Sequence, residues 1–180
     1  MQNHHPESIS TSPKIFARQN FFSCRTHLIS IVDSILHNPY SVRATALELP
    51  YTPSELYQGY RSPPLQSADP KLYTSLCEAI FPLKIPYHVH LQFQWIPESY
   101  GRGTQHQDNP QITTSGVLYL TENPPRDSGT EFSLSDGTVS VDNQFNRLVL
   151  FDSQTVHSAQ SYFGTTILDS RLTLVIFSSS

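Results

Sequence analysis

The sequence predicts an α+β domain in which two N-terminal helices pack on one sheet of a double-sheet jelly roll, or double-stranded β-helix. Apolar residues recur at helical spacing in two segments before Pro82. Beyond Pro86 the apolar residues alternate with polar ones, and glycines and an Asp-Gly turn separate the segments. Two helices followed by seven or so strands are typical of an α+β domain whose strands form a double sheet.

The composition limits the class of protein. The chain has 180 residues, enough for one domain with a real core, and its 14 prolines against 7 glycines suit short segments joined by turns. A net charge of -4 without a basic run argues against a nucleic-acid partner. Because we see neither a membrane-length apolar run nor a signal peptide, we expect a cytoplasmic protein without a membrane partner. Cys24 and Cys77 show no metal-binding spacing and are expected to be free thiols.

The N-terminal segment, residues 1–13, is polar and aperiodic, so we expect a disordered arm ahead of a single domain that spans residues 14–180. His4 and His5 in this arm could bind a metal, but a terminal histidine pair is more often simply solvated. The β-branched run His27–Asp33 predicts the first strand.

Two helices follow this strand. Asn38-Pro39 is typical of a helix start, and that helix ends at Pro50. Asp69-Pro70 repeats the signal for a helix that ends near Pro82. The segment Tyr51–Asp69 between them combines prolines with tyrosines. We expect either a loop over the site or a packed surface loop, and both interpretations stay open.

The rest of the chain predicts strands separated by turns. The expected strands are Tyr87–Ile96, Thr114–Thr121, Thr130–Ser135, Thr138–Val141, Arg147–Phe151, Gln160–Phe163 and Arg171–Ser178.

Residues that can bind a metal occur within this β part. His106 and Asp108 alternate around Gln107, so on an extended backbone both side chains leave the same face. His157 lies 49 positions after Asp108, and Arg171 lies 14 positions after His157. His-x-Asp with a distal histidine is the pattern of a two-histidine, one-carboxylate facial triad, which indicates non-haem Fe(II).

With these residues, and with G-V-L-Y-L-T, G-T-E-F and N-R-L-V-L-F-D-S, the chain resembles the Fe(II)/2-oxoglutarate-dependent oxygenases, in particular the prolyl-hydroxylase-like branch. The resemblance extends from Leu91 to Phe177. It implies that His106, Asp108 and His157 are the catalytic metal ligands for Fe(II). It also implies 2-oxoglutarate and O2 as cosubstrates, with ascorbate as a candidate reductant.

The resemblance assigns the cosubstrate to a second group of residues. Arg171 and Thr173 match the Arg-x-Ser/Thr pattern that binds the distal carboxylate of 2-oxoglutarate, a task for which the planar guanidinium is suited. Tyr119 matches the position of a phenol that is directed at the same cosubstrate, and the alternative is a core tyrosine. Arg147 is the competing cation, but its place at the start of a strand predicts an exposed side chain.

The implied activity is that of a dioxygenase of the hydroxylase type, or one that desaturates or cyclises its substrate. Asp108 stands where halogenating relatives have Gly or Ala, so a halide on the iron is not expected. No second arginine follows Arg171 at short spacing, unlike in the nucleic-acid-dealkylating branch.

We expect the substrate to be a small amino-acid or peptide-like metabolite. Arg61 and Tyr60 in the aromatic loop could cover such a ligand and meet its carboxylate. Trp95 and Tyr100 are further candidate contacts, although a core position is at least as good an interpretation for Trp95. The sequence does not indicate an oligomeric state.

Two other classes of function are weaker candidates. His88-Val89-His90 matches the start of a cupin metal motif, but the nearest acidic residue, Glu98, lies too far along the chain. A non-catalytic jelly-roll binding module would keep the fold but would lack one of the candidate metal ligands or the arginine that matches Arg171. This chain has all of these residues. No G-x-S-x-G segment supports a serine nucleophile.

Overall fold

A computed structural model describes residues 19–24 and 27–179, with side chains from Ile29 onward. Its elements in chain order are β1 (Gln19–Cys24), β2 (His27–Asp33), α1 (Pro39–Glu48), β3 (Thr52–Pro53), β4 (Tyr60–Arg61), α2 (Leu65–Ala68), α3 (Pro70–Ile80), β5 (His88–Ile96), the 3-10 turn η1 (Glu98–Tyr100), β6 (Thr114–Tyr119), β7 (Thr130–Leu134), β8 (Gly137–Val141), β9 (Arg147–Asp152), β10 (Val156–Ala159) and β11 (Arg171–Ser179).

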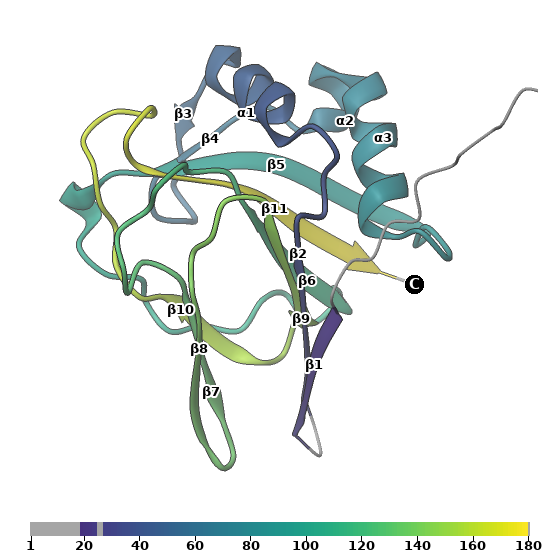
Figure 1. Cartoon of the computed structure of the whole chain (residues 1–180), viewed down its shortest axis with the longest axis vertical. Helices are drawn as coiled ribbons and strands as arrows, with labels where there is room; N and C mark the ends of the chain where they lie inside the picture. Colours follow the sequence, from purple (N-terminus) through teal and green to yellow (C-terminus); the bar gives the residue numbers. More distant parts are fainter. Residues whose placement is uncertain (1–18, 25–26, 180) are drawn as a thin grey trace, which may run out of the picture.

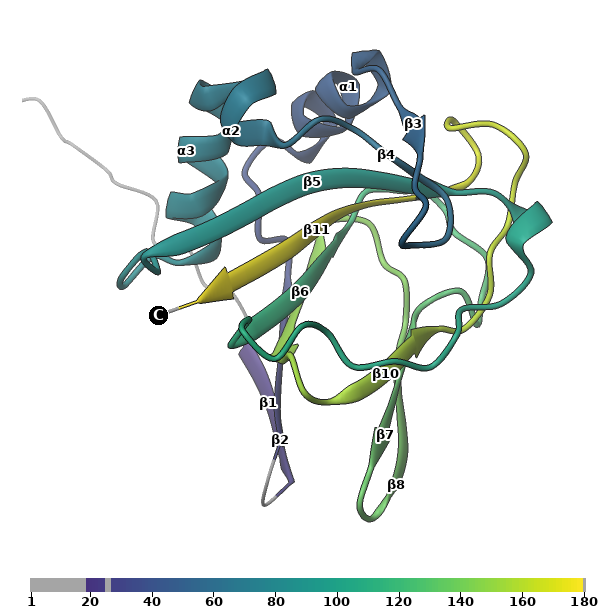
Figure 2. The same ribbon diagram turned by 180° about the vertical axis from the view of Figure 1, so that it is seen from behind.

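The strands form two antiparallel sheets. The large sheet has eight strands in the order β1-β2-β9-β6-β11-β5-β4-β3, and the small sheet has three in the order β10-β7-β8. The last strand, β11, lies between β5 and β6, so the order interleaves segments that are far apart in the sequence. Figures 1 and 2 show the helices on one side of the large sheet and the small sheet on the other. This arrangement confirms the predicted α+β jelly roll.

Both predicted helices are present and begin at the predicted caps. The Asn38 side chain accepts a hydrogen bond from Ser41 N at 3.2 Å, and the Asp69 side chain accepts one from Leu72 N at 2.9 Å. Each bond satisfies a backbone donor that the first turn of a helix leaves without a partner. One additional short helix, α2, precedes α3.

The large sheet carries an apolar core on each face. On the helix side, the core includes Ala46, Leu76, Phe93 and Leu174, each no more than 1% exposed. Between the sheets, a second cluster is formed by Ile29, Tyr119, Phe132, Val141, Val149 and Phe151. Burial of each large side chain contributes about 1.5–3 kcal/mol. The helices therefore stabilise the back of the sheet, and the functional site can lie on its other face.

One strand prediction is wrong. Gln160–Phe163 is a loop, in which Gln160 N donates to Gly129 O and Tyr162 N donates to Gly101 O. The strand is instead β10, which pairs with β7 and places His157 opposite Phe132. Pairing across the small sheet therefore decides the position of this strand, not its own apolar pattern.

The segment between the helices is more structured than a loop. β3 and β4 form a hairpin that extends the edge of the large sheet beyond β5. In this register Tyr60 lies opposite Trp95, and Arg61 lies opposite Gln94.

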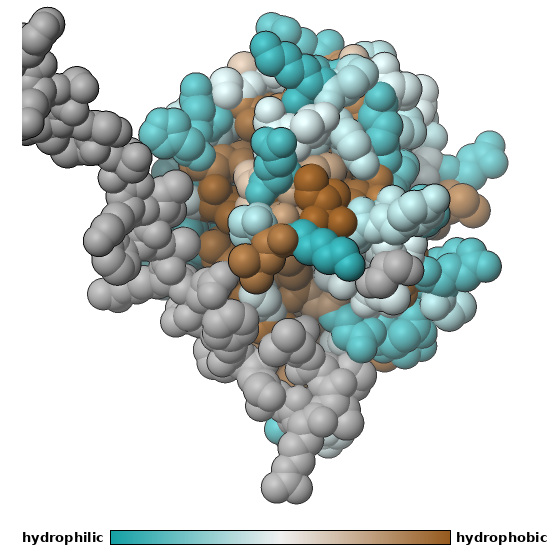
Figure 3. All heavy atoms as spheres, turned by 90° about the vertical axis from the view of Figure 1, so that its right-hand side faces the viewer, coloured by the Kyte–Doolittle hydropathy of each residue, from teal (hydrophilic) through white to brown (hydrophobic). Residues whose placement is uncertain are grey.

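The remaining expectations concern the surface and the N-terminal arm. The arm of residues 1–13 and the Cys24 side chain lie outside the described residues, while Cys77 is a buried free thiol. No helix in the described ranges is long and apolar enough to cross a membrane. The face in Figure 3 shows apolar side chains among hydrophilic ones, and the α3–β5 connection at the right of Figure 1 exposes Leu83 and Ile85.

Candidate metal centre

The His106–Asp108 segment runs along β10. His106 N donates to His157 O at 3.0 Å, and His157 N donates to His106 O at 2.9 Å. Two residues further on, Asp108 N donates to Ser153 O at 3.0 Å. These bonds at alternate positions keep the segment extended, so both side chains point to the same side.

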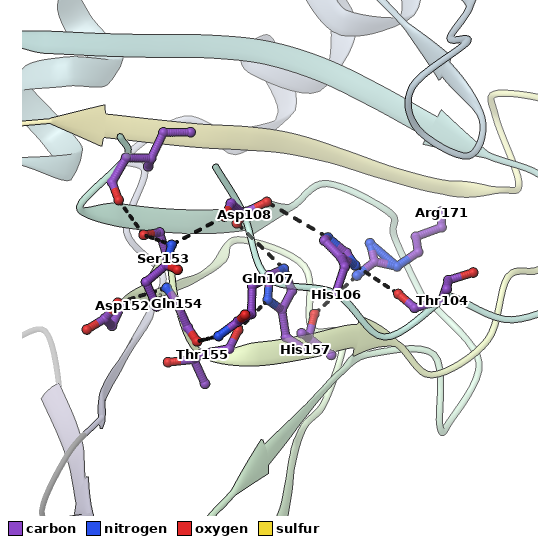
Figure 4. Close-up of polar contacts among 12 residues, drawn as sticks. Thr104, His106, Gln107, Asp108, Asp152, Ser153, Gln154, Thr155, His157 and Arg171 are labelled. Atoms are coloured by element: carbon purple, nitrogen blue, oxygen red, sulfur yellow. Dashed lines mark hydrogen bonds and ion pairs between the residues drawn. The ribbon is translucent and has the colours of Figure 1, made fainter. Parts of the chain in front are cut away.

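His106, Asp108 and His157 form one cluster, which we name the His-Asp-His cluster. Their ligand atoms all lie within 4.8 Å of one another. His106 Nε2 lies 3.8 Å from Asp108 Oδ1, and His157 Nε2 lies 3.7 Å from Asp108 Oδ2 (Figure 4). Two atoms that each bind one metal ion at about 2 Å can be at most about 4 Å apart, so both His–Asp separations fit a shared ion.

The two imidazoles are oriented by the same local contact. His106 Nδ1 lies 2.8 Å from Thr104 O, and His157 Nδ1 lies 2.9 Å from Thr155 O. A carbonyl oxygen can only accept, so each Nδ1 carries the proton and each Nε2 offers its lone pair to the cluster. Burial lowers the pKa of His157 below its usual range, which favours the neutral form that binds a metal.

The cluster opens into a cavity of about 460 Å³ between the sheets. The small sheet and its connections contribute Thr130, His157 and Ala159. The large sheet contributes two arginines, Arg61 and Arg171. Thr173 and Gln94 line the same cavity. A metal bound by the cluster would therefore face a space that holds two buried positive charges.

Arg171 lies at the start of β11 and is 4% exposed. Its Nη2 donates to Thr130 Oγ1 at 3.3 Å, while its buried Nε has no hydrogen-bond partner. Among the described residues, no acidic side chain forms an ion pair with it. Arg171 can therefore take an anionic ligand within the cavity.

Thr173 and Tyr119, the other two residues predicted to bind the cosubstrate, differ in their access. Thr173 lines the cavity beside Arg171. Tyr119 is fully buried next to Arg171. Its hydroxyl lies 2.7 Å from Thr130 Oγ1, and its ring centroid lies 5.2 Å from Arg171 Cζ. Tyr119 contacts the arginine and Thr130 and does not line the cavity, so in this structure it supports the guanidinium. Burial raises the pKa of Tyr119, so the phenol stays neutral.

The competing cation, Arg147, lies elsewhere. Its Nε forms an ion pair with Asp33 Oδ1 at 2.6 Å, and its side chain does not line the cavity. Arg147 is thus paired with a carboxylate of the protein, whereas Arg61 and Arg171 form no ion pair with an acidic side chain among the described residues.

Three of the four candidate substrate contacts, Tyr60, Arg61 and Trp95, lie on the large sheet, and the fourth, Tyr100, lies in η1. Arg61 lines the cavity, whereas Tyr60, Trp95 and Tyr100 do not. Tyr60 stacks on Trp95 with centroids 4.5 Å apart and meets Tyr100 edge-on. Successive strand residues point to opposite faces, so the alternation that places Arg61 in the cavity turns Tyr60 away from it. Of the four candidate contacts, Arg61 is thus the one that the structure places in the cavity.

Several residues of the cavity were not predicted. Tyr57 and Gln58 come from the β3–β4 hairpin, Tyr162 from the β10–β11 connection, and Thr130 from β7. The tyrosine-rich composition of the segment between the helices is the one signal that could have indicated Tyr57. Thr130 belongs to the G-T-E-F segment, whereas Gln58 and Tyr162 are single polar residues without a motif.

His88 and His90, the candidate cupin ligands, lie apart from the cluster. His88 is exposed, and His90 lies beside Phe177 and Gln92. Within the described part of the chain, the His-Asp-His cluster is the one group of three such side chains that could hold a metal.

The structure is similar to solved structures of oxygenases at low sequence identity. A prolyl-4-hydroxylase from Pseudomonas putida matches with a TM-score of 0.64 and 21% identity, over 84% of this chain and 92% of that chain. HygX from Streptomyces hygroscopicus, solved with nickel and 2-oxoglutarate bound, matches with a TM-score of 0.62 and 10% identity, over 84% and 83%. A 2OG-Fe(II) oxygenase family oxidoreductase from Burkholderia pseudomallei matches with a TM-score of 0.59 and 13% identity, over 83% and 82%.

No protein-family model and no curated protein sequence matches the chain. The similarity to known proteins is therefore one of fold. The chain has the double-stranded β-helix fold of the Fe(II)/2-oxoglutarate-dependent oxygenases, with a His-Asp-His cluster in the cavity between its sheets.

Proposed function

We propose that this protein is a non-haem Fe(II)/2-oxoglutarate-dependent dioxygenase that hydroxylates, desaturates or cyclises a small amino-acid or peptide-like metabolite. The observation that carries the proposal is the His-Asp-His cluster, whose two Nε2 atoms are directed at one carboxylate in a cavity that also contains Arg171.

His106, Asp108 and His157 would hold the Fe(II), which supplies the activation of O2 when it is bound. Two neutral imidazoles and a carboxylate are the donor set of the facial triad, which leaves positions open for other ligands. The carbonyls of Thr104 and Thr155 hold the two rings in place and fix their tautomer. The protein thus orients the ligands before any metal binds.

Arg171 would pair with the distal carboxylate of 2-oxoglutarate, and Thr173 would donate a hydroxyl hydrogen bond to it. A buried guanidinium matches a carboxylate with two parallel, charge-assisted hydrogen bonds. Tyr119 and Thr130 would position Arg171. Thr130 Oγ1 accepts a hydrogen bond from the guanidinium, and the Tyr119 ring lies against the guanidinium while its hydroxyl bonds to the same Thr130 oxygen.

The size of the cavity supports a small substrate. Its volume of about 460 Å³ lies within the range of small-molecule pockets, and the cosubstrate would occupy part of it. Leu56, Tyr57 and Gln58 of the β3–β4 hairpin line this cavity and would contact such a substrate.

The test is an anaerobic titration of the protein with Fe(II) and 2-oxoglutarate, followed by exposure to O2. We expect the weak visible charge-transfer band of a chelated 2-oxo acid, and then release of succinate. Asp108→Ala should lose both signals, whereas Asp142→Ala, at an exposed carboxylate, should keep them. A wild-type protein that folds and binds Fe(II) but gives no band and no succinate would refute the proposal.

A further inference from the structure

The cavity contains a second arginine that the binding of one 2-oxoglutarate does not require. Arg61 is 9% exposed, and its Nε is buried without a hydrogen-bond partner. In the described ranges it forms no ion pair with an acidic side chain. A guanidinium stays charged in a protein, so this buried charge is stabilised only in part by the chain itself.

The groups around Arg61 already have other partners. Gln94 Nε2 donates to Gln58 O at 2.8 Å, and Tyr162 OH donates to Gln58 Oε1 at 2.8 Å. Gln58 Nε2 in turn donates to Arg102 O at 3.3 Å. These bonds fix the hairpin against β5 and the β10–β11 connection. The Asp108 carboxylate acts on Arg61 at longer range, but among the described residues no acidic side chain forms an ion pair with it.

Tyr57 limits the direction from which a ligand can bind. Arg61 Cζ lies 4.5 Å from the centroid of the Tyr57 ring, which covers one face of the guanidinium. A ring in this position leaves the edges of the guanidinium, which carry its N–H donors, for contacts in the plane. A planar anion approaching edge-on from the cavity fits this geometry.

The register of the sheet separates Arg61 from the proposed cosubstrate site. Arg61 lies opposite Gln94, and Gln94 lies opposite Thr173, so the three side chains form one row across β4, β5 and β11. Two strand spacings place Arg61 roughly 10 Å from Thr173. This is a separation of backbones, and one carboxylate that is held by Arg171 and Thr173 already has its charge paired, so the charge of Arg61 remains for a second anion.

We infer that Arg61 binds a carboxylate of the substrate and thereby orients it over the His-Asp-His cluster. This inference rests on the proposed function, which it narrows to substrates that carry a carboxylate. A carboxylate is preferred over a phosphate because Arg61 supplies a single positive charge on this wall, beside the neutral amides of Gln58 and Gln94. A phosphate dianion would leave one charge without a partner.

The experiment measures carboxylate recognition directly. The full-length protein is loaded with Ni(II) and saturating 2-oxoglutarate, so that the first anion site is filled and no turnover occurs. Free L-amino acids and their carboxamides are then titrated as matched pairs, with benzoate, benzamide and phenyl phosphate as a second set. Binding is followed by the shift in melting temperature and by calorimetry.

For the wild type we expect at least one carboxylate to bind roughly thirtyfold or more tightly than its amide, as is typical of a buried charge pair. Arg61→Met, which keeps the length and apolar stem, should bring this ratio close to one. Arg61→Lys should retain part of the ratio, because it keeps the charge but not the planar fork. Arg126→Met, at an exposed arginine, is the matched control and should keep the wild-type ratio.

Each other outcome overturns the inference. A wild type without carboxylate preference, or an Arg61→Met protein that keeps it, removes the role of Arg61. If Arg61→Met is folded but no longer forms the Fe(II)/2-oxoglutarate band, Arg61 belongs to the cosubstrate site. Tighter binding of phenyl phosphate than of benzoate changes the class of anion. If Arg61→Met does not fold, an unchanged ratio in Arg61→Lys is the contradicting result.

Failure of the proposed function gives a different pattern. In that case the wild type forms no charge-transfer band with Fe(II) and 2-oxoglutarate, and this result does not depend on the outcome of the carboxylate titration.

Discussion

At the scale of single residues, His106 and His157 are oriented by the same kind of backbone hydrogen bond. Each ring donates from Nδ1 to the carbonyl oxygen two positions earlier, that of Thr104 for His106 and that of Thr155 for His157. The backbone therefore fixes both the direction and the tautomer of the ligands. The His157 ring also packs edge-on against Phe151, so the core between the sheets supports this ligand candidate as well.

Removal of His157 tests the metal site at this scale. His157→Ala should lose bound Fe(II) and reduce succinate formation by far more than tenfold, because changes to groups behind a ligand already cost 10–100-fold. Metal content by elemental analysis and succinate by mass spectrometry are the measurements. His90→Ala, at a partly buried histidine outside the cluster, is the control. If His157→Ala keeps a tenth of the activity, the distal ligand is a different residue.

Arg171 is tested through the cosubstrate. Arg171→Ala would leave the distal carboxylate of 2-oxoglutarate buried without its partner, which costs roughly 2–5 kcal/mol. We expect the apparent KM for 2-oxoglutarate to rise about thirtyfold or more. Arg147→Ala, which removes the ion pair with Asp33 outside the cavity, should leave this KM unchanged. If instead Arg147→Ala raises the KM for 2-oxoglutarate and Arg171→Ala leaves it unchanged, Arg147 is the residue that binds the cosubstrate.

At the scale of elements, the β3–β4 hairpin depends on Gly59. Its φ is +88°, and a Cβ at this position would lie 2.6 Å from Trp95 O and 2.7 Å from a side-chain carbon of Ile96. Such a contact cannot form without a shift of the hairpin away from β5. Because Arg61 lies on β4, the position of this hairpin decides where the second guanidinium stands in the cavity.

Substitution of Gly59 should therefore affect both stability and substrate binding. Gly59→Ala is expected to lower the free energy of unfolding by roughly 1–3 kcal/mol and to weaken carboxylate binding. Gly101→Ala is the matched control, because its φ is also positive, at +72°, but an added Cβ would meet nothing within 4 Å. Denaturant unfolding of both variants separates the clash from the backbone strain. Equal losses in the two variants would show that close packing against β5 is not required.

The elements that the sequence predicted well are those with local signals. Both helix starts carry a capping side chain followed by proline, β5 alternates apolar and polar residues over most of its length, and β11 contains a continuous apolar run. The spacing and the family resemblance singled out His106, Asp108 and His157, and the structure brings these three side chains together, although His106 lies in a loop that forms a single bridge.

The wrong predictions concern elements that exist only through pairing. Val156–Ala159 is short and contains His and Ser, and it is a strand because β7 provides the partner. β4 has two residues and no periodicity of its own, so its register against β5 could not be predicted. That register decides that Arg61, and not Tyr60, lines the cavity.

At the scale of the whole molecule, the site is built from residues of both sheets, and these sheets are also held together by an apolar core between them. His157 belongs to the small sheet, Arg171 and Thr173 belong to the large sheet, and the connection after η1 supplies His106 and Asp108. The cluster of Tyr119, Phe132 and Phe151 packs between the two sheets. A ligand that engages both sheets stabilises the folded state, since an unfolded chain does not present these groups together.

Ligand-linked stability is therefore the prediction for the whole molecule. At a free concentration one hundred times the dissociation constant, a ligand stabilises the fold by about 2.7 kcal/mol. For a chain of this size each kcal/mol raises the melting temperature by about 2–4 °C. We thus expect Ni(II) with 2-oxoglutarate to raise Tm by roughly 5–10 °C, with EDTA reversing the shift. The shift should be absent in Asp108→Ala and present in Asp142→Ala. A shift that persists in Asp108→Ala would place the stabilising metal outside the His-Asp-His cluster.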